Sequence, residues 1–417
     1  MTIAFRYRKS ERGAVAIIVG LSLPVLIGFA GLALDLGRLF VTKTELQNAA
    51  DACALAAANE LVCDPTITTC PREFLQNAQS AGIYVAGRNK KDFQGSNVSI
   101  VPSDIKFFTA LAPNSSYLPA GTADTKSRFA MCTASATGLI PYLMGALGFG
   151  PQAVSAQGAA TRAPAQSSCN SAPVGICAKP SSSGPNYGYS VGEWITSSFT
   201  GAANNNDTEL TGGFRWVDYT ANAGGTNEVR NQLLGNDEVC GIRVGNNVTE
   251  QGVKQGAKSA WNTRFGFYPN GNNAEIVTTA PPDKTGYSYP SKSPGTVIAI
   301  GSSAYADYVA KQATNKPFID AEYDAGNISG SQITQEQHLQ YGAERRLVAS
   351  PIISCDQAPA PVTILAMACV LMLNPMASGP EDKIYLEWRG LAKDSNACRS
   401  AGVVGGVSGP RVPTLVQ

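Results

Sequence analysis

The sequence lacks most of the residues on which site chemistry usually depends. It has a single histidine, His338, and its ten cysteines include no Cys-x-x-Cys pair. A catalytic zinc site draws on histidine and closely spaced cysteine ligands, so no metal site is expected. One nucleophile-elbow spacing occurs, at 188–192, but a Pro- and Ser-rich stretch precedes it where an elbow needs a buried strand. We therefore expect neither a cofactor nor an enzyme activity.

Charge of either sign is scarce as well. Charged residues make up 15% of the chain, and the formal net charge is +1. A nucleic-acid partner requires many lysines and arginines on one face to neutralise phosphates, and the sequence has no such basic stripe. Nucleic-acid binding is therefore not expected. Gly, Pro, Ser, Thr and Asn are abundant instead, which favours turns and short strands.

A long apolar run lies near the N-terminus. Residues 13–34 are apolar apart from Ser22, and as a helix they span roughly 33 Å, which matches the hydrocarbon core of a bilayer. A proline inside the run would kink the helix, which membranes tolerate. A cleaved signal peptide and a buried core helix are the alternatives to a membrane anchor. The residues predicted to form the anchor are Gly13, Ile17, Ile18, Leu23, Pro24, Leu26 and Leu34.

Basic residues precede the apolar run, in the predicted tail 1–12. Arg6, Arg8, Lys9 and Arg12 are opposed there only by Glu11. Because an excess of positive charge stays on the cytoplasmic side of a membrane, the N-terminus is predicted to be cytoplasmic and the rest of the chain to lie outside. The lipid bilayer is thus the first predicted partner.

A helical pattern continues over residues 35–62. Leu39, Leu46, Ala50, Cys53 and Ala57 recur at helical spacing and form a narrow seam of mostly small residues that suits close packing. With the apolar run, this predicts one helix of about 48 residues, or roughly 70 Å. Two possibilities stay open for the seam: it docks on the protein's own outer domain, or it packs on another protein.

The same N-terminal residues carry a family resemblance. The segments are Arg12-Gly-Ala-Val-Ala-Ile-Ile, Gly31-Leu-Ala-Leu-Asp-Leu-Gly-Arg38 and Leu46-Gln-Asn-Ala-Ala-Asp-Ala-Cys-Ala-Leu-Ala-Ala-Ala58. Together they resemble the TadG-like proteins of the bacterial tight-adherence (Flp pilus) assembly systems. The resemblance implies a single-pass protein of the inner (cytoplasmic) membrane. Its periplasmic or extracellular bulk would contact other pilus-assembly or pilin proteins.

One position departs from the related pseudopilins. Those proteins carry a glutamate five residues after a glycine, at the site that prepilin peptidase cuts. Counting from Gly13, this position is occupied by Ile18. The resemblance therefore implies that the anchor is retained and that the chain does not enter the fibre as a mature subunit.

Beyond the helix the sequence predicts an α+β protein with two outer domains. Residues 63–165 are predicted to form a small mixed α/β domain, with strands at 105–108 and 128–136 and a short buried packing helix at 138–147. A Pro-, Ser- and Gly-rich linker is expected at 166–187. Residues 188–417 are predicted to be β-rich, with a buried strand at 362–373.

The even number of cysteines favours disulfides in an oxidising compartment. The pairs Cys63/Cys70 and Cys169/Cys177 bound short polar loops and suggest local bridges, although spacing does not fix the connectivity. Cys53 and Cys369 lie in apolar runs and are instead interpreted as small buried side chains. The candidates for disulfide bonding are Cys63, Cys70, Cys169, Cys177, Cys355 and Cys398.

These features predict a membrane-anchored structural component of Flp (tight-adherence) pilus assembly that acts by protein–protein contacts in the cell envelope. The alternative is a surface adhesin whose β-rich region binds a ligand directly. Four tryptophans would be available to line such a surface, although aromatic residues more often lie in the core.

Overall fold

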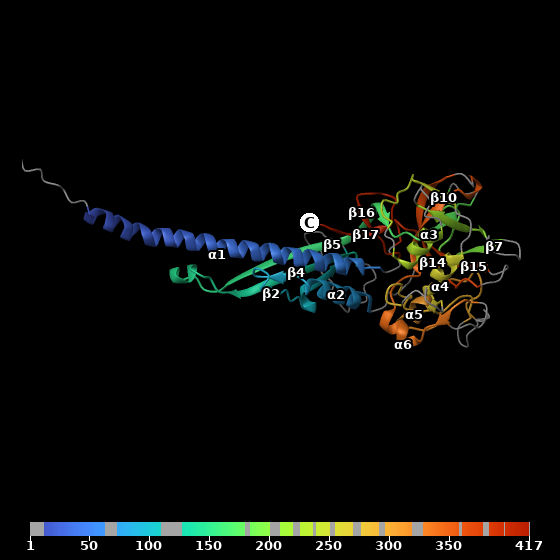
Figure 1. Cartoon of the computed structure of the whole chain (residues 1–417), viewed down its shortest axis with the longest axis horizontal. Helices are drawn as coiled ribbons and strands as arrows, with labels where there is room; N and C mark the ends of the chain where they lie inside the picture. The colour runs from blue at the N-terminus through green and yellow to red at the C-terminus, as the bar shows by residue number, and fades with distance from the viewer. Residues whose placement is uncertain are drawn as a thin grey trace, which may run out of the picture.

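The computed structural model of the chain is elongated, with a long helix protruding from a folded head (Figure 1). The fold is α+β with a β-rich C-terminal part, as predicted. The structure describes residues 12–62, 73–109, 127–179, 184–200, 209–219, 226–236, 239–250, 255–269, 277–291, 297–318, 328–357, 361–377, 383–395 and 397–416.

The protruding helix, α1 (Arg12–Asn59), is continuous over 48 residues and includes Pro24. Its C-terminal half packs beside α2 (Glu73–Ala86). The same half packs against a sheet that contains β3 (Ile105–Phe108), β4 (Phe129–Leu139) and β5 (Gln152–Cys169). The predicted helix length and the predicted strand at 105–108 are therefore confirmed. The continuous helix joins the apolar N-terminal run directly to the first folded module.

The small-residue seam of α1 faces this sheet. Leu46, Ala50, Cys53 and Ala57 are fully buried, and Leu39 packs half-buried at the end of the same cluster. At Gly158 of β5, a Cβ atom would lie 2.8 Å from the carbonyl carbon of Ala50, so the strand touches the helix backbone. The seam therefore docks on the protein's own module, which decides between the two possibilities that the sequence left open.

The end of the chain returns to this module. β16 (Ala401–Val404) and β17 (Arg411–Leu415) both pair antiparallel with β5, with Leu415 opposite Ala160. Together with β3 and β4 they complete a five-stranded sheet. The structure thus differs from the predicted domain division, because a sheet assigned to residues 63–165 is built partly from 401–415.

The second sheet has eight strands in the order β10-β9-β6-β13-β14-β15-β7-β8, and β10 also pairs with β14. β6 pairs parallel with β13, and the other neighbours are antiparallel. The strands are β6 (Val174–Cys177), β7 (Trp194–Thr200), β8 (Glu209–Gly212), β9 (Phe214–Asp218), β10 (Asn247–Glu250), β13 (Leu347–Ile353), β14 (Val362–Met372) and β15 (Lys383–Leu391).

The segment 166–187 is another difference, because its described part is not a linker. It contains the end of β5 and the whole of β6, so the chain passes from one sheet into the other within a few residues. The Pro- and Ser-rich composition misled the prediction, because the small residues here pack inside sheets. The predicted buried strand at 362–373 corresponds to β14, of which the C-terminal half is buried.

Short elements complete the fold. The helices are α3 (Thr226–Leu234), α4 (Gln255–Thr263), α5 (Tyr305–Ala313) and α6 (Gln335–Tyr341), and the small strand pairs are β1 (Lys90–Lys91) with β2 (Ser96–Asn97) and β11 (Phe267–Tyr268) with β12 (Ser331–Gln332). Single 3-10 turns lie at Pro102–Asp104, Met144–Leu147 and Cys355–Gln357.

All four tryptophans lie in the core of the β-rich part. Trp194, Trp216, Trp261 and Trp388 are buried, and the rings of Trp216 and Trp261 meet edge to face at 6.0 Å. The aromatic residues thus stabilise the sheet and its covering helices. They do not form the ligand-binding surface that the adhesin hypothesis would use.

Disulfides join elements that are distant in sequence. The described bonds are Cys53–Cys132, Cys169–Cys240, Cys177–Cys355 and Cys369–Cys398. A local Cys169/Cys177 bridge was therefore wrong, because β5 and β6 carry these cysteines into different sheets. The interpretation of Cys53 and Cys369 as buried thiols was also wrong. Cys63 and Cys70 lie outside the described residues.

His338 is fully buried, although the residues around it in the sequence are mostly polar. The ring Nδ1 lies 2.8 Å from the carbonyl oxygen of Asp283 and must donate to it, because a carbonyl only accepts. The Asp283 carboxylate accepts from Tyr308 Oη at 3.0 Å and from the backbone N–H groups of Arg345 and Arg346. This cluster joins α5, α6 and the start of β13.

We predict that Gly158→Ala loosens the docking of α1. The added methyl would meet the helix backbone, so the free energy of unfolding should fall by about 1–3 kcal/mol, as for other overpacked cores. Thermal unfolding of the purified full-length chain in detergent micelles measures this. Gly150→Ala is the matched control because its Cβ would meet nothing within 4 Å. Equal stability of the two variants would contradict the close packing.

We predict a loss of stability in weak acid that depends on His338. Burial lowers the pKa of its ring below 6.5, so below that pH the unfolded chain binds a proton that the folded chain does not. Stability should fall as the pH decreases below about 6.5. The His338→Asn variant should be less stable than the wild type at neutral pH. Its unfolding temperature should, however, change less between pH 7.5 and 5.5. An unchanged slope in the variant would refute the assignment.

Candidate functional site at the end of the apolar helix

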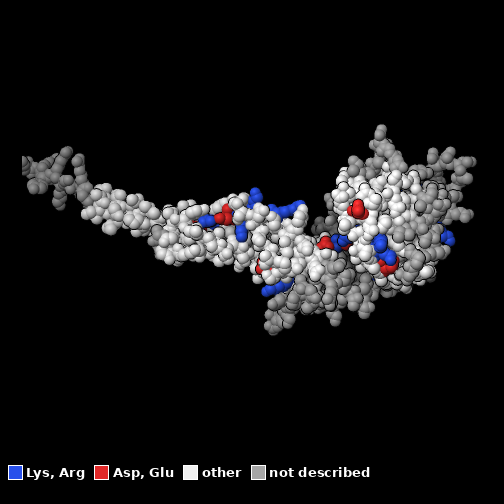
Figure 2. Space-filling model, turned by 90° about the horizontal axis from the view of Figure 1, so that it is seen from below, with Lys and Arg blue, Asp and Glu red and all other residues white. Residues whose placement is uncertain are grey.

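The N-terminal half of α1 carries a continuous apolar surface that the rest of the protein leaves uncovered. Only 6% of its most apolar stretch is buried, which argues against the core helix that the sequence analysis left as an alternative. Figure 2 shows no charged side chain on the visible face of this described segment. An apolar surface of this extent marks a membrane or protein contact. The predicted anchor side chains Ile17, Ile18, Leu23, Leu26 and Leu34 are all exposed on it.

The remaining predicted residues of this region divide into two groups. Gly13 and Pro24 lie within α1, and Arg12 is its first residue. Arg6, Arg8 and Lys9 lie outside the described residues. By its length and composition, α1 is long and apolar enough to cross a membrane.

A hairpin tip lies beside α1 where the apolar run ends. β4 and β5 extend along the helix, and the loop between them reaches its midpoint (Figure 1). The Asp35 carboxylate accepts hydrogen bonds there from the backbone N–H groups of Tyr142, Leu143 and Met144, at 2.7, 2.9 and 2.6 Å. One acidic side chain thus satisfies three consecutive donors of the loop. We refer to residues 140–149 as the hairpin tip.

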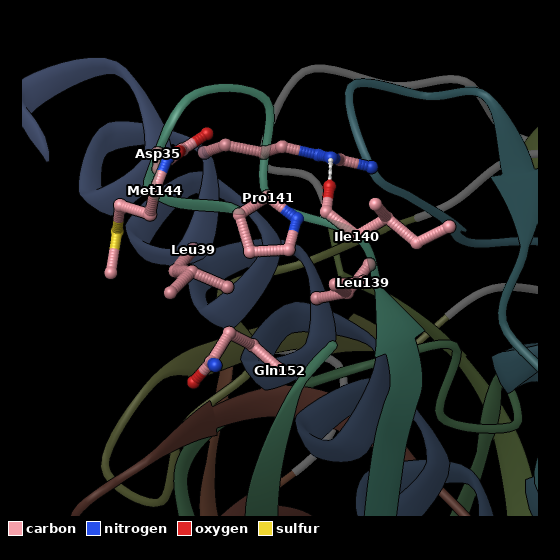
Figure 3. Close-up of a pocket in the computed structure, with 8 residues that line it drawn as sticks. Asp35, Leu39, Leu139, Ile140, Pro141, Met144 and Gln152 are labelled. Carbon is pink, nitrogen blue, oxygen red and sulfur yellow. Dashed lines mark hydrogen bonds between the residues drawn. The ribbon is translucent and has the colours of Figure 1, made fainter. Parts of the chain in front are cut away.

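Arg38, one turn further along α1, makes a second set of contacts. Its guanidinium donates twice to the Asp92 carboxylate, at 2.7 Å each. It also donates once to the carbonyl oxygen of Ile140, at 2.8 Å, which is the dashed line in Figure 3. It also lies 4.4 Å from the centre of the Tyr142 ring. Arg38 therefore holds both the hairpin tip and the turn between β1 and β2 against the helix.

Close packing completes this joint. A Cβ atom at Gly31 would lie 2.6 Å from Cβ of Leu143, so glycine is what allows the hairpin tip to approach the helix. The cavity between Asp35, Leu39, Leu139 and Gln152 has only about 10 Å³ of free space (Figure 3). Because one water molecule needs roughly 10–15 Å³, the cavity holds no larger ligand. The arrangement is a structural joint rather than a substrate pocket.

The sequence analysis missed this joint. The apolar segment 138–147 was predicted to be a buried packing helix, but it forms the end of β4, a loop and a 3-10 turn. Ile140, Tyr142 and Leu143 are exposed, and so is Phe149 beyond them. The prediction was wrong because the apolar character of this segment was interpreted as a sign that it lies in the core. An acidic residue at the end of an apolar helix was the available signal, because such a residue needs a partner.

The comparisons with known proteins concern the same helix. Residues 13–60 match the family of putative Flp pilus-assembly TadE/G-like proteins. No curated protein and no solved structure matches the chain. The matched residues coincide almost entirely with α1, which contains both the exposed apolar half and the buried seam. The match supports the TadG-like resemblance and an involvement in Flp pilus assembly.

We predict that Asp35→Ala releases the hairpin tip. Loss of a charged acceptor costs about 1.5–3 kcal/mol per hydrogen bond, so the amides of residues 142–144 should exchange their hydrogens roughly ten- to a hundredfold faster. Hydrogen exchange with mass spectrometry on the full-length chain measures this. Asp35→Asn keeps one carbonyl acceptor and should give a smaller effect, while the β4–β5 amides stay protected. Unchanged protection of the tip in Asp35→Ala would contradict the role of Asp35.

Proposed function

We propose that this protein is a membrane-anchored structural component of Flp (tight-adherence) pilus assembly, acting by protein–protein contacts in the cell envelope. The observation that carries the proposal is the form of α1. One half is an uncovered apolar surface, the other half is the core of a folded module, and both halves fall within the TadE/G-like match.

The proposed orientation places the N-terminus in the cytoplasm and the folded part in the periplasm or outside the cell. The basic residues before the apolar run support this orientation. The disulfides support it as well, since such bonds persist in oxidising compartments outside the cytoplasm.

The geometry supports a structural rather than a catalytic role. Beyond Leu34, α1 continues to Asn59, which adds a rigid rod of roughly 37 Å above the proposed membrane surface. Ser190, the only nucleophile-elbow serine, is exposed, whereas His338 is buried and bonded to Asp283. The described parts of the chain contain no cluster of metal-binding side chains. We therefore propose that the rod holds the head at a fixed distance for contact with other pilus components.

The fate of the full-length chain in its native host tests this function. With a C-terminal tag, it should be found in washed membranes, be degraded by protease added to spheroplasts, and be absent from sheared pili. Deletion of the gene should reduce surface piliation and adherence. A shortened form in the sheared-pilus fraction, or normal piliation after deletion, would refute the proposal.

A matched pair of variants tests the anchor separately. Leu23→Arg with Leu26→Arg places two charges in the middle of the proposed span, at about 2.5–3.5 kcal/mol each, and should release the chain from washed membranes. Thr44→Arg with Asn48→Arg adds the same charge to exposed positions of the same helix outside the span and should leave it membrane-bound.

A further inference from the structure

We propose that the hairpin tip is a second membrane contact, which inserts into the outer interface of the bilayer beside α1. The inserting side chains are Ile140, Tyr142, Leu143 and Phe149, which are exposed in the structure. The inference rests on the membrane anchoring proposed above and adds a second contact to it. The occupant of this exposed surface is the lipid bilayer itself.

The position of the hairpin tip along α1 sets its depth. A hydrocarbon core of about 30 Å takes some 20 helical residues, so a span that begins at Gly13 ends near residue 33. Leu143 packs on Gly31, which lies inside this span. The contacts with Asp35 and Arg38 lie just beyond it. The hairpin tip therefore reaches the boundary between hydrocarbon and headgroups.

The chemistry of the exposed side chains fits that depth. Tyrosine is enriched at membrane interfaces, where its ring is apolar and its hydroxyl remains hydrated. Tyr142 and Phe149 supply aromatic rings on the hairpin tip, and Phe40 supplies another on the neighbouring turn of α1. These residues continue the apolar surface of the helix span. A bilayer that covers Leu34 therefore meets the hairpin tip at the same level.

The charged residues of this region are turned inward. Between Gly13 and Phe40, Asp35 and Arg38 are the only charged residues in the sequence. Asp35 is 3% exposed and the Arg38 side chain 12%, because both bind the hairpin tip and Arg38 also binds Asp92. Neither charge is presented to lipid on the outer surface of the joint.

Several backbone N–H and carbonyl groups of the hairpin tip have hydrogen-bond partners within the protein, as a poorly hydrated environment requires. Peptide groups that enter a membrane need internal partners, because lipid supplies none. Asp35 accepts three N–H groups, and Arg38 donates to the carbonyl oxygen of Ile140. The N–H groups of Gly148 and Phe149 bond to carbonyl groups within the same turn.

Depth-dependent quenching of tryptophan fluorescence tests the insertion. The full-length chain would be reconstituted in phosphatidylcholine vesicles, with bromine on the acyl chains either near the headgroup or near the chain end. Phe149→Trp should show blue-shifted emission and lose intensity in the shallow-brominated vesicles, after subtraction of the wild-type signal. The four native tryptophans provide a constant background because they are buried in the distant β-rich part.

Two matched variants separate the possible results. Phe29→Trp reports on the span itself and should be quenched most by the deep bromine, whereas Tyr84→Trp on α2 should not be quenched at all. Both positions are exposed in the free chain. If the chain fails to float with the vesicles, the anchoring proposal fails. If it floats and Phe29→Trp is quenched but Phe149→Trp is not, only the hairpin inference is overturned.

Discussion

The packing of α1 on β5 is the contact on which the rest of the structure depends. Helix and strand approach so closely at Gly158 that the seam opposite must be made of small residues, and Ala50 and Ala57 meet this requirement. The docked half of the helix is thereby fixed as part of a core. Since α1 runs on without a break, the exposed half extends from that core in one defined direction. The direction of the exposed apolar half and the position of the head are thus coupled through a single element.

The other end of the chain strengthens this arrangement. β17 pairs with β5 on the same module, and the Cys53–Cys132 disulfide bonds the helix to β4. Just beyond the C-terminal end of α1, Arg399 forms an ion pair of 2.6 Å with Glu60. Of these contacts only the disulfide persists in the unfolded chain, where its closed loop, with a sequence separation of 79 between the cysteines, limits the freedom of the chain. The rod and the β-rich part therefore act as one connected body rather than as two domains joined by a linker.

The sequence predicted those features of the fold that depend on residues close together in the chain. The length of α1, the strand Ile105–Phe108 and the α+β character follow from periodicity and composition, because each depends on neighbouring residues. The pairing of β5 with β16 and β17 and the partners of Cys53 and Cys369 depend on contacts made far along the chain. Sequence spacing carries no signal for such contacts. The joint at Asp35 was missed for a related reason, since Asp35 and the N–H groups that it binds are more than a hundred residues apart.

That joint also explains why charged residues stand at the end of an apolar helix. An isolated Asp35 at a membrane surface would only limit how deep the helix can sit. Bound to three N–H groups, it becomes the point at which a loop is attached, while Arg38 neutralises Asp92 and covers Tyr142. The contact fixes which side of α1 faces the hairpin tip. Because the seam and the hairpin tip hold the helix at two places along its length, the rotation of its apolar half relative to the folded module is fixed.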